Sequence, residues 1–428
     1  MGSARIIVAG GGIGGLAAAL ALHAAGHEVE VHEAVVEPRE LGVGINLLPH
    51  SVRVLHGLGL GDELDRVGVR TSELRFTSAD GTLIWSEPRG VASGAPWPQY
   101  SLHRGRLHAV LLAAVRDRLG PAAVRTGHRV VDVHGAVEGA TSAAAVVVDR
   151  RTGERAVAEG DAVVGADGIR SVVRALLHPT GGELRHSGLV LWRGATWRPP
   201  FLDGSTMVMS GDHRQKAVVY PISPPRDDGR VLVNWVAERP VADGAAPVDW
   251  NAEVDPAEVA GPFAGWDLGW LHVGELLAAT EVAYEFPMVD RDPLERWTSG
   301  RVTLLGDAAH AMRPNGSNGS SQAVLDGESL AAALSRHDVD DALAAYEAER
   351  REPTARLTLA NRRAGPERVM SWVAERCDGR CVGEHTCVGR DELEREANAY
   401  KELAGFDLDR LRRLADAADA AGPARRPA

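Results

Sequence analysis

A glycine-rich segment near the N-terminus has the residue types and spacing that bind a dinucleotide. Gly10, Gly12 and Gly15 fit the pattern G-x-G-x-x-G. In such a turn glycine allows a tight bend, lets the backbone approach a pyrophosphate, and lets a helix pack closely on a strand. The predicted phosphate-binding residues are Gly10, Gly12, Ile13, Gly14 and Gly15.

The elements around this turn have the order that the motif requires. Residues 6–8 predict an apolar strand before it, and residues 16–22 predict an alanine-rich helix after it. The N-terminus of a helix presents free N–H groups and partial positive charge to phosphates. A second predicted strand, residues 29–33, ends at Glu33, whose carboxylate can accept hydrogen bonds from ribose hydroxyls. A glycine turn of an ordinary α/β protein would not require strand, helix and acid together, so we predict dinucleotide binding.

Two aspartates farther along the chain have similar surroundings. Asp167 lies in the segment G-A-D-G-I-R-S, and Asp307 lies in G-D-A-A-H, which begins at Gly306. Each follows an apolar strand and precedes a helix, where a carboxylate accepts hydrogen bonds from backbone N–H groups or from ligand hydroxyls. Either aspartate alone is compatible with an ordinary helix cap. Both together, behind the glycine turn, indicate a nucleotide site.

Length and composition limit the other possibilities. A chain of 428 residues can bury a large core and form more than one domain. Its formal net charge of −12 argues against a nucleic-acid partner, because phosphate binding requires a basic surface. The sequence has no apolar run long enough to span a membrane, and its three cysteines are too few for a disulfide framework. We expect a cytoplasmic protein with no membrane partner.

The order of the predicted elements indicates an α/β fold with an inserted β-sheet. Residues 72–100 and 181–295 contain alternating and Trp- or Pro-rich runs that are typical of a mostly antiparallel sheet, which we assign to the substrate. Residues 302–307 then return as a buried, parallel-type strand. The nucleotide domain is therefore predicted to be discontinuous, comprising residues 1–71, 101–180 and 296–360, and to be followed by a C-terminal helical region, 361–428, with a frayed tail.

The three motifs together resemble the aromatic-ring hydroxylase family of single-component FAD monooxygenases. They occur in the family's order and spacing, over about residues 4–360. The resemblance implies a Rossmann-like FAD-binding domain of the para-hydroxybenzoate-hydroxylase type, tightly bound FAD, and NAD(P)H and O2 as co-substrates. It implies that Asp307 binds the flavin ribityl chain and that Asp167 lies near the pyrophosphate. Arg39 and Arg104 match family arginines near the cofactor.

Segments of both predicted domains resemble, more narrowly, the phenazine-carboxylate hydroxylase branch of that family. These segments are residues 41–46, 85–90, 98–101, 191–194 and 284–292. That branch hydroxylates a carboxylated tricyclic heteroaromatic with loss of CO2, which implies a small aromatic substrate of secondary metabolism. The family implies a flavin C4a-hydroperoxide as the oxygen donor. The chain departs from the branch at residues 312–317 and in its cysteine-bearing C-terminal region, so the identity of the substrate stays open.

The loop from Pro314 to Gly319 is predicted to lie beside the flavin. Glycines in it allow backbone N–H groups to approach the flavin pyrimidine and stabilise its negative charge, and the next helix adds its positive end. We predict Pro314, Asn318 and Gly319 as the catalytic residues on the flavin side, and as part of the FAD site with Glu33 and Gly306. A turn that caps the next helix is a compatible alternative. No dedicated acid or base is identified, and His310 is predicted to be structural.

The inserted sheet supplies the candidates for contact with the aromatic substrate. They are Trp192, Arg193, Tyr220, Trp235 and Met288. Large residues on a sheet more often form the core than bind a ligand, so each has a packing alternative. Arg193 is the candidate partner for a substrate carboxylate.

Three questions stay open at this point. A flavin dehydrogenase, epoxidase or halogenase can use the same scaffold, and a non-catalytic protein would bind FAD without oxidising NAD(P)H. A monomer and a homodimer are both compatible with the sequence. Cys377, Cys381, His385 and Cys387 lie within eleven residues, but their spacing fits no zinc motif, so we predict a redox-prone loop and no metal.

Overall fold

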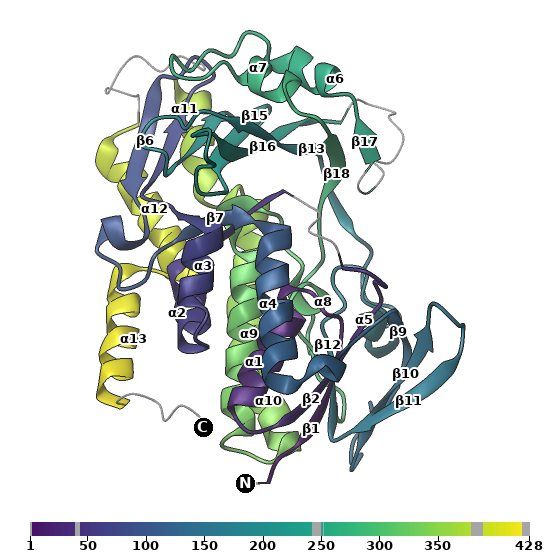
Figure 1. The fold of residues 1–428 in the computed structure, drawn as a ribbon. Coiled ribbons are helices and arrows are strands. Elements are labelled where there is room, and N and C mark those ends of the chain that lie inside the picture. The colour runs from purple at the N-terminus through teal and green to yellow at the C-terminus, as the bar shows by residue number, and fades with distance from the viewer. Residues whose placement is uncertain (1, 39–42, 242–249, 251, 378–387, 422–428) are drawn as a thin grey trace.

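The chain forms a nucleotide-binding half at one end and a large β-sheet at the other, with a C-terminal helical segment along one side (Figure 1). The computed structural model describes residues 2–38, 43–241, 250, 252–377 and 388–421. Its α/β architecture, with sheets and a C-terminal helical segment, confirms the predicted fold class.

A five-stranded parallel sheet forms the centre of the nucleotide-binding half. Its strands, in spatial order, are β19 (Val302–Leu304), β12 (Ala162–Gly165), β1 (Arg5–Ala9), β2 (Glu28–Glu33) and β8 (Val124–Thr126). The strands β1 and β12 are apolar and almost fully buried, whereas β2 carries three glutamates and is partly buried. Helices such as α1 (Ile13–Ala24) pack against this sheet, and antiparallel strands within residues 128–160 also pack against it. The predicted strands at residues 6–8 and 29–33 are therefore confirmed.

Long helices pack along this sheet. They are α1 (Ile13–Ala24), α4 (Arg104–Leu119), α9 (Gly319–Leu334) and α10 (Val339–Arg362). Small residues allow α1 and α9 to approach closely, because a Cβ on Gly14 would lie 3.0 Å from the Cβ of Ala323, and one on Gly327 would lie 2.7 Å from the Cα of Ala18. Shorter helices complete this half: α2 (Pro49–Gly57), α3 (Gly61–Val67), α5 (Val172–Leu177) and α8 (Asp307–His310).

Two small antiparallel sheets flank the nucleotide-binding half. One contains β11 (Arg155–Gly160), β10 (Ala143–Asp149) and β9 (His128–His134). The other contains β3 (Gly44–Leu47), β7 (Tyr100–His103) and β4 (Gly68–Arg70), and it leads into the larger sheet. Short 3-10 turns occur at η1 (Gly90–Ser93) and η2 (Pro121–Ala123).

An eight-stranded sheet forms the other half of the molecule. Its spatial order is β17 (Ala252–Val254), β18 (Ala283–Asp290), β13 (Arg185–Arg198), β16 (Val231–Pro240), β15 (Lys216–Pro221), β14 (Thr206–Gly211), β5 (Glu73–Thr77) and β6 (Leu83–Pro88). Only the β14–β5 pair is parallel. Two short helices, α6 (Pro256–Ala260) and α7 (Val273–Ala278), pack on one face with η3 (Gly261–Phe263).

The C-terminal segment is part of the core. It contains η5 (Gly365–Glu367), α11 (Arg368–Arg376), α12 (Arg390–Ala404) and α13 (Leu408–Ala421). Val369, Val373 and Leu393 pack with Met207 and Met209 of the large sheet, on the face opposite α6 and α7. The frayed tail predicted at the end of the chain lies outside the described residues. Among the described helices, none is long and apolar enough to cross a membrane.

Candidate active site

The glycine turn has the geometry of a phosphate-binding loop. Gly10 has a φ of +108°, and a Cβ there would lie 2.4 Å from the Ala166 carbonyl oxygen. A Cβ on Gly15 would lie 2.0 Å from the Gly10 oxygen, so both positions require glycine. A Cβ on Gly12 would meet nothing within 4 Å. The backbone in front of α1, which begins at Ile13, is therefore open to a ligand.

Glu33 ends β2 beside this turn. Its Oε2 accepts a hydrogen bond from the Gly11 N–H at 2.7 Å, and its Oε1 accepts one from the Val35 N–H at 2.6 Å. His108 of α4 reaches the same turn, with Nε2 2.7 Å from the Gly11 carbonyl oxygen. The carboxylate thus fixes the turn, and its bond to a ribose stays a prediction. Arg39 lies outside the described residues.

Asp167 caps the helix that follows it. Its Oδ2 accepts hydrogen bonds from the N–H groups of Val172 at 2.7 Å and Val173 at 3.2 Å, and the Ser171 hydroxyl donates to its other oxygen. Burial raises the pKa of Asp167 against the effect of these donors. The contacts of Asp167 are therefore those of a helix cap. Its role near the pyrophosphate stays a prediction.

Asp307 has a different environment. It is the first residue of α8 and is exposed, and no hydrogen-bond partner for it is found among the described residues. Gly306 before it has a φ of +62°. Gly319, the first residue of α9, is close by, since a Cβ there would lie 3.9 Å from Asp307 Oδ1. An available carboxylate and the positive end of α9 thus lie at the same place, which suits a polyhydroxylated anionic ligand.

His310 belongs to a buried network behind Asp307. Its Nε2 lies 2.6 Å from Asp326 Oδ2, which also accepts from the Gly306 N–H at 3.0 Å. Arg350 Nε donates to the other oxygen of Asp326 at 2.8 Å. Burial favours the neutral acid, but His310 and Arg350 lower the pKa of Asp326 to about 2. This arrangement places His310 in the support of the Gly306 turn.

The predicted flavin-side loop has two residues in the left-handed region. Its centre is the 3-10 turn η4 (Asn315–Ser317), where Gly316 has a φ of +71° and Ser317 a φ of +56°. A non-glycine residue in this region is strained, and such strain is common at functional sites. Pro314 is exposed, whereas Asn318 is fully buried, with its Nδ2 3.0 Å from the Gly316 oxygen and its Oδ1 without a partner in the described chain.

Tyr400 of α12 holds this loop from the C-terminal segment. Its hydroxyl accepts from Asn318 Nδ2 at 2.9 Å and donates to Asn361 Oδ1 at 2.8 Å. A Cβ on Gly316 would lie 2.1 Å from that hydroxyl oxygen, so glycine is required there. Tyr400 is not among the site residues predicted from the sequence. The buried residues of α12 recur at helical spacing, at positions 393, 397, 400 and 404. This spacing indicates that one face of the helix is packed, but it does not indicate which element packs against it.

The large sheet separates the predicted substrate residues into two groups. Trp192 and Trp235 lie on the face covered by α6 and α7, which we call the far face. The indole N–H of Trp192 donates to Glu285 at 2.9 Å, and that of Trp235 donates to Thr280 at 2.8 Å. Both are core residues with satisfied N–H groups, as the packing alternative anticipated, and we do not include them in the proposed substrate site.

Arg193 and Tyr220 lie on the opposite face, which we call the near face. Arg193 Nη2 donates to the Gly44 carbonyl oxygen at 3.0 Å, and the Gly44 N–H donates to Asn234 Oδ1 at 2.6 Å. A Cβ on Gly44 would lie 2.7 Å from the Tyr220 ring. The Arg193 guanidinium lies over the ring of Phe286 in β18, so Phe286 is on the near face. Met288 is two residues farther along β18 and therefore points to the same face.

The near face presents donors that have no acceptor. Arg193 Nε and Asn234 Nδ2 are buried and have no hydrogen-bond partner in the described structure. Leaving buried N–H groups unpaired is costly, and it is typical of a site whose partner is a ligand or water. Arg104, the first residue of α4, is exposed and close enough to lower the pKa of Arg193 further, although burial is the larger cause. This part of the molecule therefore suits an anion.

A buried charged cluster lies on the same face. Lys216 Nζ is 2.9 Å from Glu238 Oε2 and also contacts Glu367 of η5. Asn315 of the loop donates to Glu367 Oε2 at 2.7 Å. Burial lowers the pKa of Lys216, but its two carboxylates raise it above the usual value overall. The cluster links the near face to the flavin-side loop.

The residues predicted from the sequence do not include Asn234, Lys216 and Glu238, although the strand pattern contains a signal for them. Along β16, Asn234 and Glu238 are polar residues of equal parity, and the remaining charged residue, Arg239, has the opposite parity. Lys216 and Tyr220 share a face of β15 in the same way. Because alternate residues of a strand point to opposite faces, this parity groups the polar residues together.

A small cavity of about 20 Å³ lies between the near face and the loop. Its walls include Met207 and Met209 from β14, and Gly316 and Ser317 from the loop. Tyr400 also lines it. The near face and the loop therefore border a common space.

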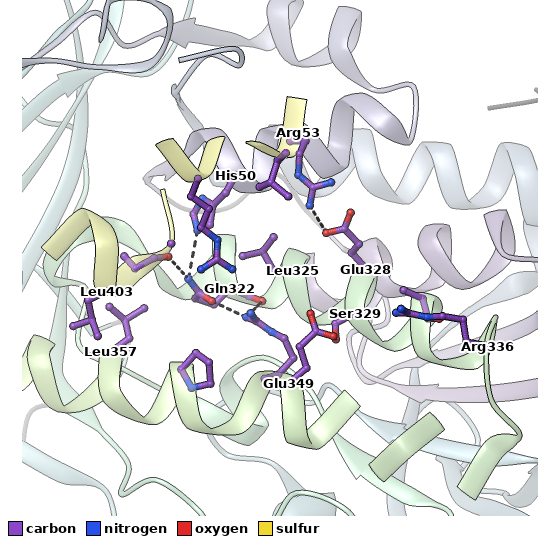
Figure 2. Close-up of a pocket in the computed structure, with 17 residues that line it drawn as sticks. His50, Arg53, Gln322, Leu325, Glu328, Ser329, Arg336, Glu349, Leu357 and Leu403 are labelled. Atoms are coloured by element: carbon purple, nitrogen blue, oxygen red, sulfur yellow. Dashed lines mark hydrogen bonds and ion pairs between the residues drawn. The ribbon is translucent and has the colours of Figure 1, made fainter. Parts of the chain in front are cut away.

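A larger cavity lies elsewhere, between α2, α9, α10 and the C-terminal helices (Figure 2). It measures about 260 Å³ and is lined by none of the predicted site residues. Several of its polar groups contact one another, since Arg53 binds Glu328 and Arg350 donates to Gln322 Oε1 at 2.6 Å. His50 Nδ1 and Arg53 Nε, however, have no hydrogen-bond partner among the described residues. Gln322 Nε2 also donates to the Ala404 carbonyl oxygen at 3.2 Å. We therefore do not assign the reaction to this cavity.

The cysteine cluster is mostly outside the described residues, which exclude Cys381, His385 and Cys387. Cys377 itself is buried at the end of α11 and takes part in a disulfide bond. In the part of the chain that the structure describes, no three His, Cys, Asp or Glu side chains are grouped to hold a metal ion.

Comparison with known proteins identifies relatives over most of the chain. Residues 3–261 and 272–361 match the family model described as FAD binding domain. The chain is 47% identical over 364 residues to phenazine 1,6-dicarboxylic acid hydroxylase PhzS of Lysobacter antibioticus, covering 83% of this chain and 89% of that protein. It is 34% identical over 362 residues to 3-amino-4-hydroxybenzoate 2-monooxygenase PtmB3 of Streptomyces platensis, covering 82% and 85%.

A solved structure has the same fold. Klebsiella pneumoniae HpxO, determined with FAD and uric acid, aligns with a TM-score of 0.70 at 24% identity and covers 96% of each chain. At this identity the likeness supports the fold alone.

Proposed function

This chain belongs to the FAD binding domain family, and we propose that it hydroxylates a carboxylated tricyclic heteroaromatic of the phenazine type with loss of the carboxyl group as CO2. Its relatives are FAD-dependent aromatic hydroxylases, and the predicted family is confirmed. The chain is accordingly an FAD-dependent monooxygenase that uses NAD(P)H and O2. The substrate, and the release of CO2, are the proposed part.

The nucleotide-binding half fits FAD. The backbone at Gly12 has open space in front of it, at the N-terminus of α1, where a pyrophosphate can lie. The exposed carboxylate of Asp307 can accept hydrogen bonds from the ribityl hydroxyls. We propose these two roles, with Glu33 at the adenosine ribose and Arg104 near the flavin.

The protein's own part in the reaction is to position the reactants and exclude water. Bound FAD supplies two-electron transfer from NAD(P)H and the transfer of one oxygen atom of O2 to an electron-rich ring, the other atom leaving as water. The N–H groups of the loop that ends at Gly319, with the positive end of α9, stabilise negative charge on the flavin pyrimidine. Asn318 and Tyr400 keep that loop in its strained conformation.

The observation that supports a carboxylated substrate is the pair of unpaired donors on the near face. A carboxylate can accept from Arg193 Nε and from Asn234 Nδ2, which satisfies both. Tyr220 pairs with Asn234 across β15 and β16, and its ring can stack with an aromatic substrate, while Met288 adds apolar surface on the same face of the sheet. The 47% identity to an enzyme named for a phenazine dicarboxylic acid points to the same chemistry.

The test uses the purified FAD-loaded protein with phenazine-1-carboxylate and, separately, with hydroxylated benzoates. We expect O2-dependent oxidation of NADH or NADPH that the phenazine acid stimulates most, and a product in which hydroxyl replaces carboxyl. A product that gains oxygen but keeps its carboxyl would remove the CO2-releasing step from the proposal. Bound FAD with no stimulation by any of these compounds would overturn it in favour of a dehydrogenase or a flavin-binding protein.

We further propose a cytoplasmic location, a monomeric or homodimeric state, and domain boundaries near residues 71, 100, 180, 295 and 360.

A further inference from the structure

The buried charged cluster on the near face contains more negative than positive side chains. Lys216 contacts two carboxylates, those of Glu238 and Glu367, and all three side chains are buried. One ammonium cannot neutralise two carboxylates, and a surplus negative charge in the interior is costly. The cluster therefore needs either another positive charge or a proton.

The two carboxylates are not equivalent. Glu367 accepts hydrogen bonds from Lys216 and from Asn315 Nδ2. Glu238 accepts from Lys216, and no second donor reaches it in the described part of the chain. Because ionised carboxylates are stabilised by each donor they gain, Glu238 is the carboxyl that a proton would occupy.

Arg193 supplies the second positive charge. It pairs with Val236 across β13 and β16, which makes it the diagonal neighbour of Glu238 on the same face, about 7–8 Å away between Cα atoms. Lys216 and Arg193 together balance Glu238 and Glu367. This balance holds only while no other anion is paired with Arg193.

We propose that Glu238 takes up one proton from solvent when a carboxylated substrate binds at Arg193, so that the substrate is held beside a neutral carboxylic acid. The added negative charge of the substrate is then offset by the loss of one on the protein. The site thereby favours an anionic ring compound over its uncharged analogue without leaving a buried excess charge. This inference rests on the function proposed above.

The surroundings of Glu238 support such an exchange. The charged groups that act on it are Lys216 from β15, Glu367 from η5 and Arg193 from β13. Burial is the largest influence and raises the pKa of Glu238 to about 7, against the opposing effects of Lys216 and Arg193. A modest change in the charge of its neighbours is therefore enough to change its protonation near neutral pH.

The experiment is calorimetric titration of the FAD-loaded protein with phenazine-1-carboxylate, slightly above neutral pH, in buffers with different ionisation enthalpies. The dependence of the binding enthalpy on the buffer gives the number of protons taken up. We expect close to one proton for the natural protein and close to none for Glu238→Gln, with binding retained. Glu238→Asp, which keeps a carboxyl, should still take up a proton. Uncharged phenazine should bind more weakly and take up none.

A matched control lies on the far face of the same sheet. Glu285→Gln removes a carboxyl that bonds Trp192, and it should leave the proton count unchanged. Binding of the acid without proton uptake, or the same uptake in Glu238→Gln, would overturn the inference and leave the proposed function in place. If the acid does not bind at all, the proposed function fails and the inference fails with it. Thermal melting and the flavin spectrum verify that each variant is folded.

Discussion

The near and far faces of the eight-stranded sheet are built from the same strands and differ in almost every physical respect. On the far face, Trp192 and Trp235 are packed under α6 and α7 with their indole N–H groups paired. On the near face, Arg193 and Asn234 have buried N–H groups without partners, and Glu238 shares an ammonium with another carboxylate. Of two adjacent residues, Trp192 therefore stabilises the core, whereas Arg193 is available to the substrate. The parity of a residue along its strand indicates its role better than its type does.

The largest expected effect is on the far face. Replacing Trp235 by alanine should lower the free energy of unfolding by about 3–5 kcal/mol, because it leaves a cavity in the core. Urea unfolding measures this, and kcat/KM per folded molecule should be unchanged. Trp235→Phe should lose clearly less stability. A stable Trp235→Ala protein with weakened substrate binding would show that the two faces are not separate.

On the near face, Arg193→Met should mainly reduce activity, whereas Trp235→Ala mainly reduces stability. We expect kcat/KM for a carboxylated substrate to fall about 100-fold, or about 2.7 kcal/mol, because the charged hydrogen bonds to the carboxylate are lost. The free energy of unfolding should fall by less than in Trp235→Ala, because the loss is that of the hydrogen bond to Gly44, and Glu238 can take up a proton when the guanidinium charge is removed. Steady-state kinetics with matched carboxylated and uncharged compounds show whether the loss of kcat/KM is specific to the carboxylate. An equal loss for both compounds would contradict the assignment of Arg193 to the carboxylate.

Tyr400→Phe tests whether the loop beside the near face depends on the C-terminal segment. Removing the hydroxyl leaves Asn361 Oδ1 without its donor and Asn318 Nδ2 with only its bond to the Gly316 oxygen, which should cost about 1–3 kcal/mol of stability. We also expect weaker retention of FAD, measured by flavin fluorescence on dilution. The matched control is Tyr100→Phe, whose hydroxyl bonds Asp65 at 2.6 Å away from the loop. If both variants release FAD equally, the effect is one of general stability.

The smallest effect concerns pH. Folding raises the pKa of Glu238 from 4.5 to about 7, so between these values the folded protein holds more protons than the unfolded chain. The contribution of this carboxyl to stability is therefore present at low pH and is lost as pH rises through that interval. Urea unfolding over this range should show a flatter dependence for Glu238→Gln. Glu285→Gln, on the far face, should retain the natural slope.

The nucleotide-binding half could be predicted from the sequence because its features are local. The turn at Gly10 to Gly15, the acid at Glu33 and the exposed Asp307 each follow from a few neighbouring residues. The near face could be predicted only in part. The predicted substrate contacts include Arg193 and Tyr220 of the near face together with two core tryptophans of the far face, because residue type does not reveal the face. Tyr400 meets Asn318 across more than eighty residues, a contact that depends on the packing of the C-terminal segment and that no local pattern indicates.

The contact between Tyr400 and the strained loop also bears on how the protein is made. Domains generally fold as units, N-terminal first, while the chain is still being synthesised. The glycine turn and its parallel sheet are complete in sequence by Leu304, well before the residue that fixes Gly316 has left the ribosome. A chain interrupted within residues 378–387 would contain every nucleotide-binding motif and still lack Tyr400. Such a chain should bind the adenosine part of FAD and hold its flavin ring poorly. Retention of FAD would therefore distinguish chains that include α12 from chains that end before it.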